Sequence, residues 1–189
     1  MKPDIKERIL DVAMDLAAEG GFENVRQRDV AARAGIALGT LYKRFRSKED
    51  ILSALLEREA QALDRRLIKR PAAGDSEAAR LVDYYDIVTR TLCRKPHLAR
   101  AMLRAMTAGE AHAAANVNAY HGRMLGLVAR AIVGADDRGP GPRELEIALI
   151  LQHIWFAALV GWAAGFHTQK TVVELMARSS AVVLRGVEP

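Results

Sequence analysis

Apolar residues recur at intervals of three and four positions over most of this chain. Near its start, the stripe consists of Ile5, Ile9, Val12 and Leu16, which fall on one face of a helix. Gly20-Gly21 follows, and glycine readily adopts the left-handed conformation that closes a helix. The opening pattern therefore predicts an amphipathic helix that ends at this glycine pair.

The same period predicts three more helices before the first long break. Two short ones, at about residues 27–34 and 38–45, are separated by Gly35. The third is long and opens at Ser47-Lys48-Glu49-Asp50, which resembles a capping box with Asp50 in place of the usual Glu or Gln. Its apolar stripe consists of Ile51, Leu52, Leu55, Leu56, Leu63 and Leu67. The stretch KRPAAGD, residues 69–75, then breaks the pattern and marks a boundary.

Helical patterns continue to the end of the chain. They predict a helix through Leu81 and Leu92 that ends before Pro96, and others at about residues 98–108, 111–133, 142–165 and 171–185. Thr171 and Glu174 offer a second capping box at the start of the last one. No alternating run is long enough for a strand. The pattern predicts an all-α fold of about nine helices.

One of these segments is long enough to cross a bilayer. Residues 147–169 contain no charged side chain. Gln152 and His153 lie near its start, however, and small residues dilute its hydropathy. We therefore favour a helix buried in the core or at a subunit interface, and expect no membrane association.

Composition narrows the class of protein. The chain has 189 residues, of which 50% are hydrophobic and 27% charged, so it can bury a sizeable core. A single cysteine, Cys93, excludes an internal disulfide framework and a cysteine-cluster zinc site. The opening MKPDIKERILD places acids where a signal peptide needs an apolar core, which predicts a cytoplasmic protein.

Basic charge is concentrated in one short stretch. Residues 26–48 contain a single acid, Asp29, and seven basic residues: Arg26, Arg28, Arg33, Lys43, Arg44, Arg46 and Lys48. Their net charge of +6 exceeds the +5 of the whole chain. Such a concentration is typical of a surface that binds a polyanion, although a solvated helix face would look similar.

The predicted helices in this stretch favour the first interpretation. Two short helices joined by a glycine turn are the plan of a helix-turn-helix, whose second helix enters the DNA major groove. Leu41 and Phe45 share a face that can pack inward. Gly39 and Lys43 lie together on another face, where the missing side chain of glycine permits close approach to a backbone. Lys48, in the first turn of the next helix, opposes the helix dipole, as expected of a lysine that points at an anion.

Residues 21–52, GFENVRQRDVAARAGIALGTLYKRFRSKEDIL, resemble the DNA-binding signature of TetR-type regulators. The matching marks are Ala34-Gly35, Gly39-Thr40-Leu41-Tyr42, Phe45 and Ser47-Lys48-Glu49. The resemblance implies a three-helix DNA-binding domain at residues 1–50 and a helical ligand-binding and dimerisation domain at 51–189. It places Thr40, Tyr42, Lys43 and Lys48 on DNA. With the neighbouring candidates, the expected DNA-binding set is Arg26, Arg28, Leu38, Gly39, Thr40, Tyr42, Lys43, Arg44 and Lys48.

Two departures from the signature affect helix starts. Ala37 stands where Ser is frequent, which removes a helix N-cap worth about 1 kcal/mol. Arg26 and Gln27 stand where a capping Thr or Ser and an apolar residue are usual. The start of the second helix is therefore uncertain, and Arg26 is a further candidate for phosphate contact.

The C-terminal part has the composition of a ligand-binding body. Apolar aromatic, methionine and leucine residues at helical spacing more often fill a core than line a cavity, and the family resemblance favours a pocket. The candidates to line it are Tyr85, Met102, Met106, Met124, Trp155, Leu159, Trp162 and Phe166. Residues 104–117 and 154–165 resemble a branch of the family that represses cholesterol catabolism. That resemblance implies an apolar inducer such as a steroid or acyl coenzyme-A thioester. Its anionic tail would need a basic group, for which Arg94, Lys95 and Arg104 are candidates.

The signatures of common enzyme classes do not occur in this sequence. It contains no GxGxxG, P-loop, GxSxG, HExxH or Glu-x-x-His motif. Cys93 and His97 are four apart, but Pro96 interrupts any helix that would join them at a metal. We expect no catalytic residues, metal or cofactor. The interpretation is a homodimeric repressor that releases double-stranded operator DNA when an inducer binds; the alternative is a helical ligand-binding protein or enzyme without DNA binding.

Overall fold

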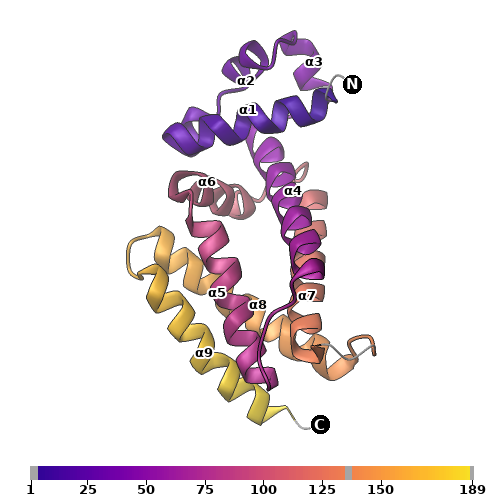
Figure 1. Cartoon of the computed structure of the whole chain (residues 1–189). Helices are drawn as coiled ribbons and strands as arrows, with labels where there is room; N and C mark the ends of the chain where they lie inside the picture. The colour runs from indigo at the N-terminus through magenta and orange to yellow at the C-terminus, as the bar shows by residue number, and fades with distance from the viewer. Residues whose placement is uncertain (1–3, 135–137, 188–189) are drawn as a thin grey trace. The chain divides into compact units, whose positions relative to one another are not determined.

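A computed structural model describes residues 4–134 and 138–187, and over these it contains nine α-helices, one short 3-10 helix and no strand. The all-α prediction is therefore confirmed. The α-helices, labelled in Figure 1, are α1 (Ile5–Gly20), α2 (Gln27–Arg33), α3 (Leu38–Tyr42), α4 (Lys48–Lys69), α5 (Glu77–Cys93), α6 (Pro96–Thr107), α7 (Ala114–Val133), α8 (Pro142–Ala163) and α9 (Gln169–Gly186). The 3-10 helix η1 (Phe22–Asn24) lies between α1 and α2 in the chain.

The described residues form two compact units. The first consists of residues 4–59 and 95–120, and the second of residues 60–94, 121–134 and 138–187. Helices α4 and α7 therefore contribute residues to both. These two units group residues by their contacts in the structure. The functional division at residue 50 is a separate prediction that they do not test.

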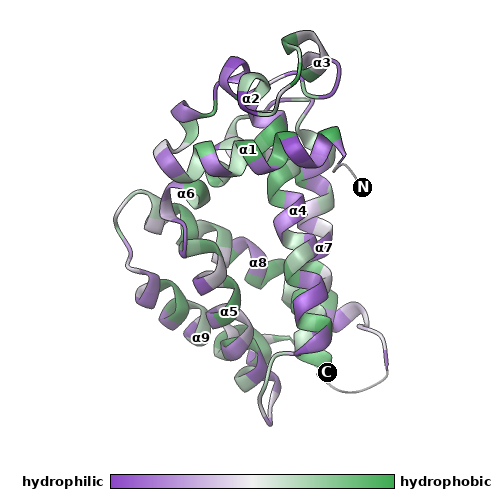
Figure 2. Ribbon diagram, turned by 45° about the horizontal axis from the view of Figure 1, so that its top comes forward, coloured by the Kyte–Doolittle hydropathy of each residue, from purple (hydrophilic) through white to green (hydrophobic). Residues whose placement is uncertain are grey.

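The first unit is built around α1. This helix packs against η1, α2 and α6, and α2 packs against α3. Hydrophilic and hydrophobic residues are interspersed along α1 in Figure 2, as expected of an amphipathic helix. Of the predicted stripe, Ile9 and Leu16 are buried, whereas Ile5 and Val12 are half-buried. Other core residues of this unit are Leu10, Val25, Val30, Leu41, Phe45, Ile51, Leu52 and Leu55.

Glycines end the first two predicted helices as expected. Gly21 and Gly35 have φ angles of 72° and 63°, in the left-handed region that glycine tolerates. The sequence did not predict η1, which fills the short connection after Gly21. Its Phe22 is buried against the rest of the unit, so this connection is a packed element.

The predicted capping box at the start of α4 is half correct. The Asp50 N–H donates to Ser47 Oγ at 3.1 Å, as a cap requires. The carboxylate of Asp50, however, accepts from the Arg46 N–H at 3.1 Å. Asp50 therefore binds the N–H of Arg46, in the connection before α4, whereas a capping box would use the N–H of Ser47.

Several predicted helix boundaries differ from the structure. Helix α3 ends at Tyr42, three residues early, because the Arg44 and Phe45 N–H groups both donate to the Leu41 carbonyl at 2.9 Å, which tightens the last turn. Helix α7 begins at Ala114, after a turn. Helix α9 begins at Gln169, because the hydroxyl of Thr168, and not of Thr171, accepts the capping N–H at 3.0 Å.

In the second unit, α9 packs against both α5 and α8. Its core residues include Leu81, Tyr84, Tyr85, Val88, Leu127, Ile132, Ile147, Leu151, Trp155, Leu159, Val172 and Met176. Arg80 on α5 donates to the carbonyls of Ala131, at 2.9 Å, and Ile132. Because these carbonyls belong to the last turn of α7, the arginine satisfies acceptors that the helix cannot satisfy itself.

Helix α8 carries the uncharged segment. By length and composition it could span a membrane, and 44% of its most apolar window is buried. The buried positions include Ile147, Leu151 and Trp155, spaced by four residues as on the inner face of a core helix. Its opposite side leaves Leu145, Leu149 and Val160 exposed. Helix α8 therefore packs as a core helix with a second, uncovered apolar face.

Candidate functional site

Helices α2 and α3 and the turn between them have the helix-turn-helix arrangement. Leu41 and Phe45 are buried, so the predicted inner face of the second helix is confirmed. Ala37 is the N-cap of α3, with extended backbone and no side-chain hydrogen bond to the helix. The missing serine therefore leaves this helix start without a side-chain cap, as the sequence indicates.

The outer surface around α3 is cationic and open. Arg26, Arg28, Lys43 and Arg44 are exposed, and none of them forms an ion pair within residues 4–134 and 138–187. A Cβ atom added at Gly39 would meet no atom within 4 Å. These five residues lie in the first unit within 19 positions of sequence, and we call them the cationic surface.

The other expected DNA-binding residues flank the cationic surface. Tyr42 is 47% exposed, while Leu38 and Thr40 on α3 are half-buried. Arg33, which is basic but was not in the expected set, pairs with Glu19 at 2.9 Å. The structure therefore leaves most of the basic stretch free to meet a polyanion, while Arg33 and, as described next, Lys48 are paired with acids.

Lys48 lies in a different environment. Its ammonium is 3.1 Å from Glu23 Oε2 and 4.0 Å from the centre of the Phe22 ring. Arg104, on α6, contacts the other carboxylate oxygen of Glu23 at 2.8 Å, and its guanidinium carbon lies 4.1 Å from the same ring centre. Hydrogen bonding and attraction to Lys48, and then to Arg104, lower the pKa of Glu23. Sequence reasoning missed Glu23, and it assigned Arg104 to ligand binding.

A groove lies beside this ion-pair cluster. It has a volume of about 480 Å³ and is lined by residues between η1 and the start of α4, among them Arg26, Arg46 and Lys48. Arg46 also approaches the ring of His112 at 3.5 Å. The acids Glu23 and Glu49 also line the groove, so basic and acidic groups face each other in it.

The residues expected to line a ligand cavity divide between the two units. Tyr85, Met124, Trp155, Leu159 and Trp162 lie in the second unit, and all are buried. Met102 and Met106 lie in the first, on α6, and are buried and half-buried. Phe166 is 83% exposed in the turn after α8, so the expectation that it faces a cavity is wrong. A residue in an exposed turn has no covering element, whatever its hydrophobicity.

Tyr85 and Trp155 form the best-defined part of this set. Their ring centres are 6.2 Å apart, and Tyr84 meets Tyr85 edge-on at 5.1 Å. The Trp155 indole N–H donates to Thr89 Oγ1 at 3.0 Å in the core. The hydroxyl of Tyr85 is buried without a hydrogen-bond partner among the described residues. Burial raises the pKa of Tyr85, so it is a neutral donor that lacks an acceptor.

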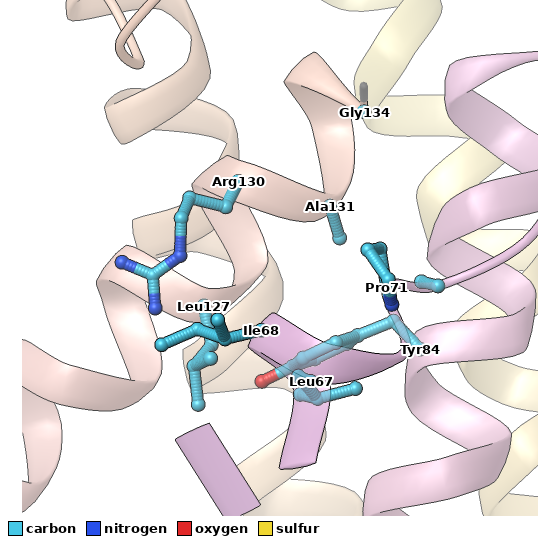
Figure 3. A pocket seen from close by; sticks show the side chains of 9 residues that line it. Leu67, Ile68, Pro71, Tyr84, Leu127, Arg130, Ala131 and Gly134 are labelled. Carbon is cyan, nitrogen blue, oxygen red and sulfur yellow. The ribbon is translucent and has the colours of Figure 1, made fainter. Parts of the chain in front are cut away.

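A small apolar pocket opens elsewhere in the second unit (Figure 3). It has a volume of about 130 Å³, below the usual 300–1,000 Å³ of small-molecule sites. Its lining includes Leu67, Tyr84, Leu127 and Arg130, and none of the expected ligand-binding residues is among its lining residues. Arg130 is held by Asp64 at 2.7 Å. This pocket can accept a small apolar group but not a whole steroid.

Titratable groups in the part of the chain that the structure describes do not form a metal site. No group of three or more His, Cys, Asp or Glu side chains is placed to bind an ion there.

His121 is half-buried and accepts from the Gln152 amide at 2.7 Å. Burial and the nearby His153 lower the pKa of His121. Arg94 and Lys95 are exposed between α5 and α6.

Comparisons with known proteins agree with the helix-turn-helix geometry. Residues 9–55 match the model for bacterial regulatory proteins of the tetR family, and residues 74–182 match that for tetracyclin repressor-like C-terminal domains. The chain is 38% identical over 157 residues to the HTH-type transcriptional repressor KstR of Rhodococcus jostii RHA1, covering 83% of this chain and 72% of the relative. It is 34% identical to KstR of Mycobacterium tuberculosis H37Rv, over 83% and 70% of the two chains.

Solved structures show the same fold. A TetR regulator from Rhodococcus sp. RHA1 superposes with a TM-score of 0.80 at 23% identity, over 97% of both chains. Thermus thermophilus FadR, solved in complex with lauroyl-CoA, superposes with a TM-score of 0.72 at 19% identity, over 97% of this chain and 95% of FadR.

The family and its relatives are transcriptional regulators and not enzymes, so the enzyme alternative is excluded. With a helix-turn-helix in its first unit, an apolar helical body and matches to both halves of the family, this chain belongs to the TetR family of ligand-responsive, DNA-binding transcriptional regulators.

Proposed function

We propose that the protein is a homodimeric repressor that leaves a palindromic operator when an apolar small molecule binds. The observation that carries the operator part is the cationic surface. Its four basic side chains are exposed and have no ion-pair partner among the described residues, and Gly39, in the same unit, has open space where a side chain would stand. Unpaired cations gain most from phosphates, because no internal partner has to be displaced.

In this proposal α3 enters the major groove. Gly39 permits close approach of the helix backbone to DNA, while Lys43 and Arg44 reach phosphates or base edges. The Tyr42 hydroxyl donates to a phosphate. Two copies of α3 would meet half-sites about 34–36 Å apart, or a multiple of that spacing. Residues 1–50 would form the DNA-binding part and residues 51–189 the ligand-binding and dimerisation part.

The inducer we propose is a steroid or acyl coenzyme-A thioester. Relatives of 34–38% identity are KstR repressors, and FadR of similar fold was solved with lauroyl-CoA. The steroid class follows from the resemblance at residues 104–117 and 154–165. Support from this chain's own structure comes from the unpartnered hydroxyl of Tyr85 beside Trp155, because a buried donor without an acceptor costs about 1–3 kcal/mol. A ligand acceptor or water at that hydroxyl would remove this cost.

The second copy would pack on α8 and α9. The uncovered apolar face of α8, with Leu145, Leu149 and Val160, supports a twofold contact in the cytoplasmic protein. A ligand that favours a dimer with wrongly spaced DNA-binding helices would weaken operator binding. Typical couplings of about 1–3 kcal/mol correspond to roughly five- to 150-fold.

Selection of bound duplexes from a random pool tests the proposal. We expect a palindromic consensus whose capture is lost on adding lauroyl-CoA or a steroid-acid coenzyme-A thioester, and not on adding coenzyme A alone. A pool without any enriched sequence would refute specific operator binding. An enriched palindrome that is insensitive to every thioester would refute the proposed inducer class only.

A further inference from the structure

The ion-pair cluster in the first unit unites three elements around one carboxylate. Glu23, on η1, is 69% exposed and binds Lys48 of α4 through one oxygen and Arg104 of α6 through the other. Both cations lie about 4 Å from the centre of the buried Phe22 ring. The ring attracts cations through its electron-rich face, so it holds the two basic groups beside the acid.

This arrangement limits what Lys48 can do. Its side chain is only 27% exposed, and its ammonium already has an anionic partner at 3.1 Å. The groups of the cationic surface meet no such competitor within the described residues. To contact Lys48, a phosphate oxygen must displace Glu23 Oε2. The displaced carboxylate oxygen would then face the negatively charged phosphate.

Resting on the proposed DNA binding, we infer that Glu23 competes with DNA phosphate for Lys48, and that Arg104 makes the exchange possible by keeping Glu23 neutralised. In the free protein the carboxylate is shared between the two cations. On DNA, Lys48 turns to the phosphate and Arg104 takes both oxygens of Glu23. Arg104 is thus a positioning residue for DNA binding, although it lies on α6, outside the helix-turn-helix.

The lowered pKa of Glu23 agrees with this assignment, because it keeps the carboxylate ionised wherever the protein binds DNA near neutral pH. Loss of Arg104 would leave Glu23 with one partner in the free protein and none in the complex. The cost of removing Arg104 therefore falls mainly on the complex. If Arg104 acted only through long-range attraction to DNA, the effect of removing it would be the same with or without Glu23. An effect that depends on Glu23 therefore identifies the positioning role.

A double-mutant cycle tests the inference. Binding of the full-length dimer to a fluorescein-labelled 30-base-pair duplex of random sequence would be measured by anisotropy at low salt for the wild type, Glu23→Gln, Arg104→Gln and the double variant. Exposed ion pairs contribute about 1.5- to fivefold each, so Glu23→Gln should tighten binding by that factor per subunit. Arg104→Gln should weaken binding by a similar factor, and this loss should shrink at least twofold in the Glu23→Gln background.

Glu49→Gln is the matched control, because Glu49 lies beside Lys48 in the first turn of α4 and has no ion pair with it among the described residues. It removes the same charge near the same phosphate. Thermal melting checks that every variant is folded. Additive effects in the cycle, or equal gains from Glu23→Gln and Glu49→Gln, would overturn the inference while leaving the proposed function intact. A wild type that binds no duplex would overturn both.

Discussion

Lys48 shows how the effect of one residue depends on its neighbours. The sequence marks it as a phosphate ligand because it stands in the first turn of a helix, where a cation opposes the dipole. In the structure it is one member of a four-residue cluster with Phe22, Glu23 and Arg104. In the proposed complex, its contribution to DNA binding is therefore the difference between the free energies of two ion pairs, one with phosphate and one with Glu23.

We expect Lys48→Ala to weaken binding to all DNA sequences about equally and to make the dependence of log K on log salt concentration shallower by about one phosphate per subunit. Titrations at several salt concentrations measure this slope. Lys69→Ala, which removes an exposed lysine at the other end of α4, should leave it unchanged. An unaltered slope in Lys48→Ala would remove Lys48 from the phosphate contacts.

His121 predicts a pH dependence of stability. Its folded-state pKa is lowered by burial and by His153, so the unfolded chain takes up the proton first as pH falls. Stability from this residue is therefore complete above the ordinary histidine pKa of about 6.5 and is lost as pH falls below it. Melting temperatures at pH 7.5 and 5.5 should differ more for the wild type than for His121→Gln. The control His97→Gln, at an exposed site on α6, should behave like the wild type, and an equal drop in all three would contradict the assignment.

At the scale of elements, α3 combines weak local stability with an open outer surface at Gly39. It has five residues, no side-chain cap at Ala37 and a glycine at its second position. Both features reduce helix stability, the cap by about 1 kcal/mol and the glycine by about 0.5–1 kcal/mol. The neighbouring buried residues Leu41 and Phe45 hold the helix in place through packing.

Gly39→Ala should raise the melting temperature slightly yet weaken DNA binding about tenfold or more. The added methyl group meets no atom of the free protein within 4 Å, but it would occupy the space that a DNA backbone needs. Ala37→Ser is the matched control, because it should stabilise α3 by about 1 kcal/mol without filling that space. If Gly39→Ala binds DNA as tightly as Ala37→Ser does, α3 does not approach DNA through Gly39.

At the scale of the whole molecule, the apolar face left on α8 indicates self-association. Leu145, Leu149 and Val160 are each more than 40% exposed on a helix whose other face is in the core. A row of exposed apolar side chains on one helix is typical of an interface. In the proposed homodimer, a twofold axis would pair two such helices.

Leu149→Glu should shift the protein from dimer to monomer and weaken binding to a palindrome more than to a single half-site. Light scattering after size exclusion measures the mass directly. Val82→Glu adds the same charge at an exposed apolar position of α5 and should stay dimeric. A Leu149→Glu variant that elutes as a dimer would place the subunit contact elsewhere.

The sequence by itself determined the α-helices of this fold and the region proposed to meet DNA. Periodic apolar residues, left-handed glycines and the basic stretch act over a few neighbouring residues, so their consequences can be read without a structure. The nine α-helices within residues 4–134 and 138–187 follow from this, as do the helix ends at Gly21 and Gly35 and the burial of Leu41 and Phe45. The start of α9 was predicted wrongly, because the hydroxyls of Thr168 and Thr171 are chemically equal candidates for its N-cap.

Only the tertiary structure decided which side chains are partners. Glu23 meets Lys48 from 25 positions away, and Trp155 donates to Thr89 across 66. Such pairs depend on how helices pack, and many arrangements satisfy the same periodicity. Packing also left Phe166 in solvent, buried the hydroxyl of Tyr85 and brought Arg104 to a carboxylate near the DNA-binding helices. The sequence shows where the charged residues lie along the chain, but only the folded structure shows which of them are neutralised by an ion-pair partner.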